Sequence, residues 1–237
     1  MHAMPLVSRH VVVAVDGPSG SGKSSVSRRV ALELHGEYLD TGAMYRAMTL
    51  WFIERGLDPR DELVVRKNVA LPGVSSFTDP RHPQVHLDGI DVSGRIRAAD
   101  VTAAVSYVSA VPEVRQRLVG LQRAVVALAQ SRNTDIVVEG RDVGHVVLPA
   151  ADLKVFLTAD VEVRAARRHL EELQRGADVD AAAARSSITD RDAIDTTRTA
   201  SPLAQPVDAF VIDATHLDID AVVAQILALV ELARAAI

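Results

Sequence analysis

The chain has 237 residues, 48% of them hydrophobic, and a formal net charge of −5 at pH 7. This length is enough to bury a sizeable core and is typical of one domain with insertions, whereas the acidic balance argues against a general nucleic-acid binder, which needs a basic face. No cysteine occurs, so disulfides, thiolate metal sites and cysteine nucleophiles are excluded.

The N-terminal segment lacks the features of a secretory signal, because residues 1–10 are too few and too polar for its apolar region. The sequence also contains no run of about 18 apolar residues, the length that a membrane-spanning helix needs. We therefore expect a cytoplasmic protein without a membrane or nucleic-acid partner. The eight histidines show no metal-ligand spacing, so we expect any metal to arrive with a ligand.

A phosphate-binding motif follows the first apolar run, Val11–Asp16, which is typical of a buried strand. Residues 17–24 match G-x-x-x-x-G-K-[ST], whose glycines allow consecutive backbone N–H groups to surround an anion at the start of a helix. Lys23 would reach the β- and γ-phosphates of ATP, and the Ser24 hydroxyl would face Mg²⁺. Asp16 either orients a group near Mg²⁺ or closes the strand. The predicted ATP-binding residues are Gly17, Pro18, Ser19, Gly20, Ser21, Gly22, Lys23, Ser24 and Ser25.

A second anion site is predicted at the start of the next helix. A short strand around Tyr38-Leu39 leads through residues 40–42 into a helix from Ala43 to Arg55. Tyr45 and Arg46 then lie on its first turn, near the end of a helix that favours negative charge. This placement suits a phosphate group.

The remaining elements alternate between strands and helices, apart from one insert. Between Pro72 and Arg97, short alternating pieces separated by proline, aspartate and glycine predict a small antiparallel β insert. The other expected elements are a helix at 112–131, strands at 136–138 and 155–157, a helix at 161–184 interrupted near Gly176, a strand at 210–212 and a closing helix from 219. This order predicts the α/β class, with a parallel sheet covered by helices on both faces.

An arginine and a carboxylate follow the strand at 136–138, in the segment Glu139-Gly140-Arg141-Asp142. Guanidinium groups suit phosphate, and a carboxylate can accept a hydrogen bond from an amino group of a base or from a sugar hydroxyl. The alternative for Asp142 is a structural salt bridge to a neighbouring arginine. Arg164, Arg167, Arg168 and Arg175 lie on the helix at 161–184, where we expect solvated surface charge.

Other phosphate-loop classes lack their signatures here. The three lysines are not in an Asn- or Thr-Lys-x-Asp segment, which a GTPase needs to read guanine. The strand at 136–138 does not end in the Asp-Glu pair that is usual in motor-type ATPases. A small-molecule kinase therefore fits best, although the loop alone names a nucleotide and not a reaction.

Six segments occur in the order seen in bacterial cytidylate kinases, and the chain resembles that family over nearly its whole length. They are Gly17–Ser24, Leu39–Arg46, Val92–Arg97, Pro112–Arg115, Glu139–Gly144 and Arg198–Leu203. The resemblance implies a single phosphate-loop kinase domain over residues 1–237. It also implies a monophosphate-binding insert at about 72–110 and a mobile helical lid at about 176–199.

The resemblance further implies transfer of the γ-phosphoryl group from Mg-ATP to CMP or dCMP, in a monomer. Ser106, Arg115 and Asp142 would surround the cytosine, with Arg198 beside it, and Thr41 and Asp195 would face the sugar. Arg46 and Arg141 would hold the acceptor phosphate, while Arg191 would reach the transferring phosphoryl group from the lid. The implied catalytic residues are Lys23, Arg46, Arg141 and Arg191, and the implied CMP-binding residues are Thr41, Tyr45, Arg46, Ser106, Arg115, Arg141, Asp142, Asp195 and Arg198.

Two alternatives stay open at the level of sequence. One is another phosphate-loop kinase that acts on UMP, AMP or a sugar hydroxyl. The other is a regulatory protein that binds ATP as a switch without kinase activity. The acceptor dependence of ADP formation distinguishes all three.

Overall fold

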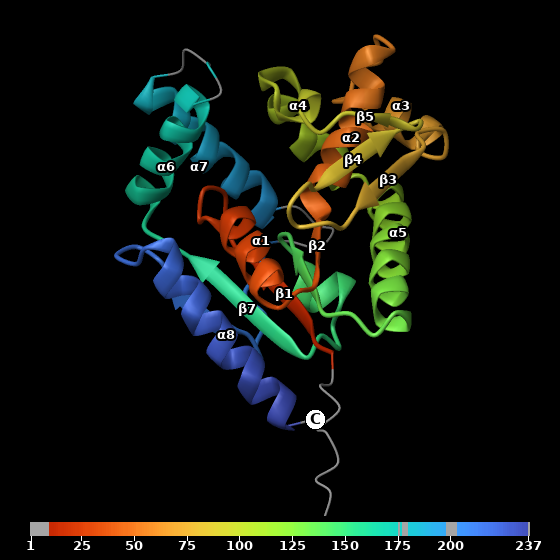
Figure 1. The fold of residues 1–237 in the computed structure, drawn as a ribbon. Coiled ribbons are helices and arrows are strands. Elements are labelled where there is room, and N and C mark those ends of the chain that lie inside the picture. The colour runs from red at the N-terminus through yellow and green to blue at the C-terminus, as the bar shows by residue number, and fades with distance from the viewer. Residues whose placement is uncertain (1–9, 175, 177–179, 198–202, 237) are drawn as a thin grey trace, which may run out of the picture.

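A five-stranded parallel sheet runs through the middle of the molecule in the order β2-β6-β1-β7-β8 (Figure 1). The computed structural model describes residues 10–174, 176, 180–197 and 203–236. The strands are β1 (Val12–Asp16), β2 (Glu37–Asp40), β6 (Ile136–Glu139), β7 (Leu153–Thr158) and β8 (Phe210–Asp213). All four neighbouring pairs are parallel, which brings the carboxyl ends of the strands to one edge of the sheet.

Helices cover both faces of this sheet. α1 (Lys23–Glu33) and α8 (Ile219–Ala236) lie on one face, and α2 (Thr41–Glu54) and α5 (Pro112–Ser131) lie on the other. Side chains of β1 alternate between the two cores: Val13 and Val15 pack in the core that includes α1 and α8, and Val12 and Ala14 in the other. The predicted α/β class is confirmed.

Two additions stand beyond the carboxyl edge of the sheet (Figure 1). One is the antiparallel sheet of β3 (Val74–Phe77), β4 (Gln84–Leu87) and β5 (Ile90–Asp91), with the 3₁₀ turn η1 (Arg95–Arg97) and helices α3 (Glu62–Asn68) and α4 (Ala99–Ala110). The other is the packed pair α6 (Val161–Gln174) and α7 (Ala181–Thr197). The predicted β insert is therefore confirmed.

Three features differ from the sequence-based expectation. α3 and α4 are additional helices; α3 carries a readable start signal, since the Asp61 side chain accepts hydrogen bonds from the first-turn amides of Leu63 and Val64. α7 extends to Thr197 instead of ending at Ala184, because burial of Ile188 and Asp195 outweighs a polar local sequence with several poor helix formers.

Among the described residues, no helix combines the length and the apolar character needed to cross a membrane.

Candidate active site

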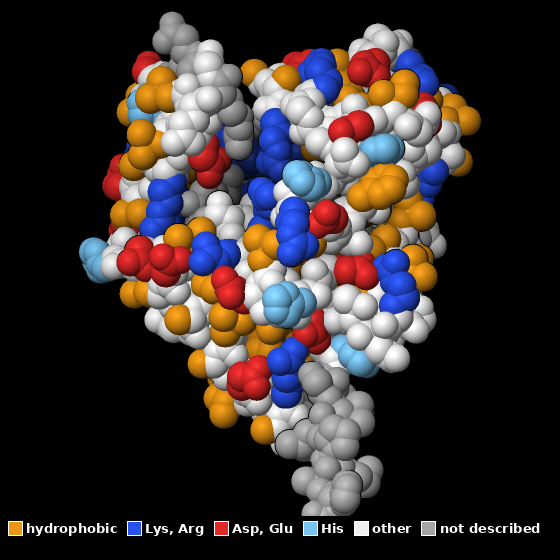
Figure 2. All heavy atoms as spheres, viewed as in Figure 1, with side chains coloured by type: hydrophobic (Ala, Val, Ile, Leu, Met, Phe, Trp, Pro, Cys, Tyr) orange, Lys and Arg blue, Asp and Glu red, His pale blue; other side chains and the backbone are white. Residues whose placement is uncertain are grey.

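Three buried or half-buried carboxylates mark the carboxyl edge of the parallel sheet. Asp16, Asp40 and Glu139 end β1, β2 and β6, and Glu139 lies opposite both Val15 and Asp40 in the strand register. The loops that follow these strands must therefore converge, as expected at the ligand-binding edge of an α/β sheet. Figure 2 shows this region as a hollow between the two additions, with Lys and Arg side chains gathered inside it.

The phosphate loop makes its turn directly against β7. Gly17 has φ +151°, and a Cβ at this position would lie 2.0 Å from the Leu157 carbonyl oxygen, so only glycine fits. The loop then enters α1, where Lys23 Nζ donates a 2.7 Å hydrogen bond to the Pro18 carbonyl. Burial lowers the pKa of Lys23. A bound triphosphate would supply the negative charge that stabilises the ammonium form.

Glu139 lies beside this lysine and is not among the residues predicted above. Burial raises its pKa, and the neighbouring Asp40 carboxylate raises it further. The Tyr38 hydroxyl donates a hydrogen bond to one of its carboxylate oxygens, and Ser24 is a second hydrogen-bond partner. A carboxylate that ends the strand next to β1 is the sequence signal that points to it. Excess negative charge next to the Ser24 hydroxyl fits a Mg²⁺ ion, which prefers such oxygen ligands.

Asp16 closes the strand rather than facing the cleft. Its two carboxylate oxygens accept 2.7 Å hydrogen bonds from the amides of Val143 and Gly144. These amides begin the π-helical turn η2 (Val143–Val147) that follows β6. Of the two roles left open for Asp16, the structure supports the structural one.

Three arginines predicted to hold phosphates meet at the phosphate loop. Arg46, Arg141 and Arg191 line one cavity together with Lys23 and Ser24. Burial, together with the adjacent Arg141, lowers the pKa of Arg191 to about 10. Burial and the nearby Arg191 also lower the pKa of Arg46. An anion in this cavity would relieve the accumulated positive charge.

A second cavity joins the first through the same arginines. Its lining includes every described residue that the resemblance implies for CMP: Thr41, Tyr45, Arg46, Ser106, Arg115, Arg141, Asp142 and Asp195. These residues come from five separate segments of the chain, and the fold brings them together. Arg198 lies outside the described residues.

A buried ion pair, Arg115–Asp142, contributes to the lining of this second cavity. The Arg115 and Asp142 side chains are only 5% and 6% exposed, and the guanidinium donates to the carboxylate. Arg115 also donates a 3.1 Å hydrogen bond to the Ser109 carbonyl, and its guanidinium lies 5.4 Å from the centre of the Tyr45 ring. A carboxylate has about four acceptor positions, so this pair leaves Asp142 able to accept from a ligand.

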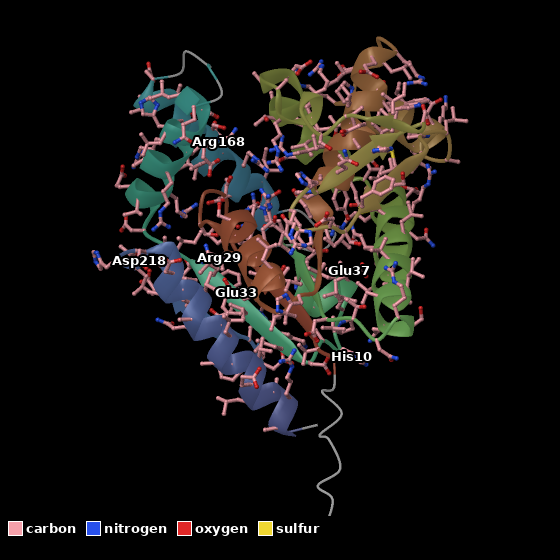
Figure 3. All side chains as sticks on the ribbon, in the orientation of Figure 1. His10, Arg29, Glu33, Glu37, Arg168 and Asp218 are labelled. Atoms are coloured by element: carbon pink, nitrogen blue, oxygen red, sulfur yellow. The ribbon has the colours of Figure 1, made fainter. Side chains whose placement is uncertain are left out.

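The expectation of solvated charge on α6 is wrong for Arg164. This side chain is buried and donates hydrogen bonds to the carbonyls of Ala159 (3.0 Å) and Ser19 (2.9 Å). The physical reason is that α6 packs over the phosphate loop, whose outward-facing carbonyls need donors. Arg168, labelled in Figure 3, is mostly buried and pairs with Glu172 at 2.6 Å. Arg175 lies outside the residues that the structure describes.

Arg167 borders a cavity on the other side of the phosphate loop. Its guanidinium donates to the Ala214 carbonyl at 2.8 Å and to the Ser21 carbonyl at 3.5 Å. The cavity has a volume of about 380 Å³ and lies between α6 and the start of α8. Apolar side chains such as Leu170, Leu217 and Val222 line it, which suits a flat aromatic ring.

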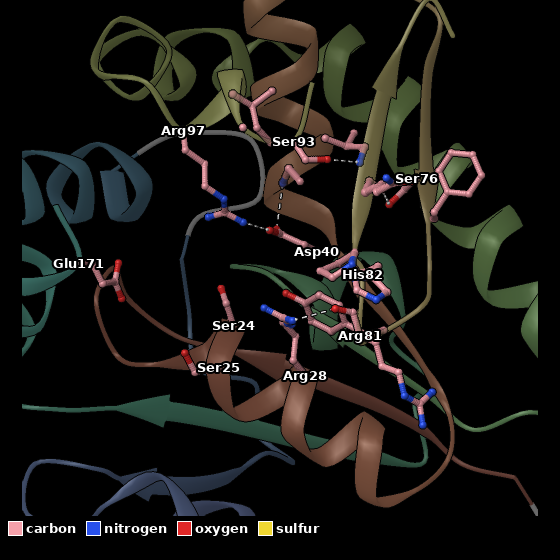
Figure 4. Close-up of a pocket in the computed structure, with 18 of the residues that line it drawn as sticks. Ser24, Ser25, Arg28, Asp40, Ser76, Arg81, His82, Ser93, Arg97 and Glu171 are labelled. Carbon is pink, nitrogen blue, oxygen red and sulfur yellow. Dashed lines mark hydrogen bonds and ion pairs between the residues drawn. The ribbon is translucent and has the colours of Figure 1, made fainter. Parts of the chain in front are cut away.

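A larger cleft of about 660 Å³ lies in front of α1, between the phosphate loop and the β insert (Figure 4). Arg97 reaches into it from the insert and pairs with Asp40 at 3.3 Å. Arg28 of α1 donates a 3.2 Å hydrogen bond to the Pro80 carbonyl. These two contacts connect the insert to the elements that carry the phosphate site.

Within the part of the chain that the structure describes, no group of three or more His, Asp or Glu side chains is arranged to hold a metal ion by itself.

Comparisons with known proteins identify the family to which the chain is similar. A family model described as cytidylate kinase matches residues 13–232. The chain is 50% identical over 226 residues to the cytidylate kinase of Streptomyces avermitilis, covering 95% of each chain. It is 51% identical over 225 residues to that of Streptomyces coelicolor, covering 95% of this chain and 94% of the relative. A crystal structure of a sugar kinase from a Janibacter species is similar in fold, with a TM-score of 0.50 at 14% identity over 95% of this chain and 97% of that one.

Proposed function

The chain belongs to the cytidylate kinase family and is a nucleoside monophosphate kinase, and we propose that its cleft transfers the γ-phosphoryl group of ATP to CMP or dCMP. The products would be ADP and CDP or dCDP. One observation carries this proposal: eight acceptor-site residues line a single cavity that meets the phosphate loop at Arg46, Arg141 and Arg191. We further propose that the enzyme works as a monomer in the cytoplasm.

The acceptor would lie in the second cavity with its base against the buried ion pair. Asp142 would accept a hydrogen bond from the cytosine amino group, whereas the uracil carbonyl at that position would be repelled. Ser106 and Arg115 would complete the base site, and Thr41 and Asp195 would face the sugar. The support is that Asp142 and Arg115 line this cavity as a buried ion pair.

The donor would place its phosphates in the loop at residues 17–25 and its base in the cavity beside Arg167. This assignment of the adenine goes beyond the sequence, which contains no adenine-reading motif. The hydrogen bonds of Arg167 to Ser21 and Ala214 fix its guanidinium at the border between the loop and the apolar cavity. A base stacked there would be continuous with the triphosphate.

Mg²⁺ would be held by the Ser24 hydroxyl and the Glu139 carboxylate, directly or through water. When bound, it would neutralise part of the triphosphate charge. Lys23 would hold the β- and γ-phosphates on the opposite side. The raised pKa of Glu139 supports this site, because a nearby cation would stabilise its ionised form.

The acceptor oxygen is already an anion near neutral pH, so no general base is needed. The residues of the chain would instead align the two phosphates and balance their negative charge. Arg46 and Arg141 would hold the acceptor phosphate, and Arg191 would stabilise the transferring group. We propose that residues 72–110 close over CMP. The segment 176–199, which includes the whole of α7, would act as the lid that excludes water.

The test is Mg²⁺-dependent ADP formation from ATP with CMP, dCMP, UMP, AMP and GMP in parallel. The fastest turnover is expected with CMP or dCMP. Lys23→Ala should lower turnover by about a thousandfold or more, because it removes the charge nearest the transferring phosphoryl group, with little change in melting temperature. ADP formation that is independent of any acceptor, or fastest with another monophosphate, would contradict the proposal.

A further inference from the structure

One lid carboxylate lies within the cluster of cations around the phosphate loop. Asp192 of α7 accepts a 3.0 Å hydrogen bond from the Ser19 backbone amide. The same oxygen is 3.4 Å from Arg141 Nη1, and its other oxygen accepts a hydrogen bond from Arg164. The Asp192 side chain is 18% exposed. It is therefore a partly buried contact with three donors, stronger than an exposed surface pair.

These three donors belong to elements that must keep a fixed geometry during transfer. Ser19 lies in the loop proposed to hold the donor phosphates, and Arg141 follows β6 and is proposed to hold the acceptor phosphate. Arg164 belongs to α6, the partner helix of α7. One carboxylate thus connects the donor side, the acceptor side and both helices of the pair α6–α7.

The rest of α7 is aligned by this contact. Arg191, the preceding residue, reaches to 3.4 Å from the Ser19 hydroxyl. Asp195, almost one turn further along α7, pairs with Arg141 at 3.2 Å. Because these side chains share one rigid helix, the Asp192 contact determines how far Arg191 reaches into the cavity.

The contact leaves room for the phosphates. Both backbone polar groups of Ser19 are used by the helices α6 and α7, since its amide donates to Asp192 and its carbonyl accepts from Arg164. The amides from Gly20 to Ser24, at the start of α1, remain to surround a triphosphate. Asp192 therefore lies beside the phosphate position and not in it.

We propose that Asp192 is a positioning residue that anchors α7 on the phosphate loop and so holds Arg141 and Arg191 in register with the two phosphates. This inference rests on the proposed kinase function. Loss of the anchor would misplace the arginines without removing them. A misplacement of about 1 Å can lower a rate about 100-fold, and a looser lid would admit water.

The experiment compares wild type, Asp192→Asn and Asp190→Asn in the same assay. Asp190 lies on the same helix, is exposed and accepts a 3.1 Å hydrogen bond from the neighbouring Ser186 hydroxyl, so its variant should behave as wild type. For Asp192→Asn we expect kcat with CMP to fall about 10- to 100-fold, while the KM values for ATP and CMP change less than about threefold. The share of ATP that is hydrolysed instead of transferred should rise. Asp192→Glu, which keeps the charge, should recover part of kcat and restore coupling.

The outcomes separate this inference from the function on which it rests. If wild type itself shows no CMP-dependent ADP formation, the proposed function fails. If wild type is active and Asp192→Asn keeps its kcat and coupling, the positioning role is overturned. A lower KM for ATP at unchanged or higher kcat would also overturn it, because the carboxylate would then compete with the triphosphate. If Asp192→Asn does not fold at the assay temperature, the kcat and coupling of Asp192→Glu decide the matter.

Discussion

Replacing Asp142 by Asn tests the base site most directly, because the change keeps the shape of the side chain and removes its charge. Asp142 forms a buried pair with Arg115, and both side chains are about as buried as core residues. Removing one partner of a buried pair costs about 3–5 kcal/mol of stability. For a chain of this size, that corresponds to a fall in melting temperature of about 6–20 °C, so the kinetics should be measured well below the transition.

The specificity effect has two parts. In the variant, the one side-chain oxygen of Asn accepts from Arg115 and the amide nitrogen faces the base, so CMP loses a hydrogen bond to a charged acceptor, worth about 1.5–3 kcal/mol. UMP no longer places a carbonyl against a carboxylate, and the amide of Asn can donate to it instead, a relief of about 1–3 kcal/mol. Together they amount to about 2.5 kcal/mol or more, so the ratio of kcat/KM for CMP to that for UMP should fall at least about 50-fold.

The assay is steady-state ADP formation with CMP and UMP at saturating Mg-ATP, with the KM for ATP as an internal reference. A base-reading role predicts that the KM for ATP stays near its wild-type value. Equal losses on CMP and UMP would show that the Arg115–Asp142 pair only supports the fold, and that reasoning about base selection from this carboxylate is mistaken.

Two further variants test the donor site and a buried acid. Arg167→Met should raise the KM for ATP about tenfold and leave the KM for CMP unchanged, because it removes the guanidinium proposed to lie against the adenine, a cation–π contact worth about 0.5–2 kcal/mol. An unchanged KM for ATP would move the adenine elsewhere. Arg185→Met, at an exposed position on α7, is the control. Burial raises the pKa of Asp16 from 3.8 to about 6, although the hydrogen bonds from Val143 and Gly144 act in the opposite direction. Between these two pH values, the folded chain keeps a proton that the unfolded chain releases. The stability therefore falls as the pH rises from about 4 to about 6. Asn cannot titrate, so the unfolding free energy of wild type minus that of Asp16→Asn should fall by about 2–2.5 kcal/mol between pH 4 and pH 7. A difference that is constant with pH in urea titrations would refute the burial argument.

Local signals account for the parts of the fold and site that sequence predicts well. The phosphate loop is a continuous motif with a strand before it and a helix after it, and all three lie within residues 12–33. The parallel sheet follows from the alternation of apolar strands with helices, which needs no knowledge of distant contacts. The acceptor-site residues are widely separated in the chain, and the family resemblance, more than any local pattern, picks them out.

Contacts between distant elements account for what sequence does not reveal. Arg164 looks like a surface charge on α6 until α6 is packed on Ser19, 145 positions earlier. Asp16 meets Val143 and Gly144 only when β1 and β6 are neighbours. The length of α7 likewise depends on which of its side chains are buried by α6. In each case the residue type alone is uninformative, and the role of the residue depends on its contact with a distant part of the chain.

The same cleft explains how an acidic chain can bind two anionic substrates. The net charge of −5 belongs to the whole sequence. Arg46, Arg141 and Arg191, by contrast, line the same cavity, and burial there lowers the pKa values of Arg46 and Arg191. Without phosphates, part of this positive charge is balanced by Asp192 and Asp195, both from α7. Because they lie on the helix that carries Arg191, the balance of charge depends on the position of α7. If α7 acts as the proposed lid, substrate binding would change both at once and so link phosphate recognition to the exclusion of water.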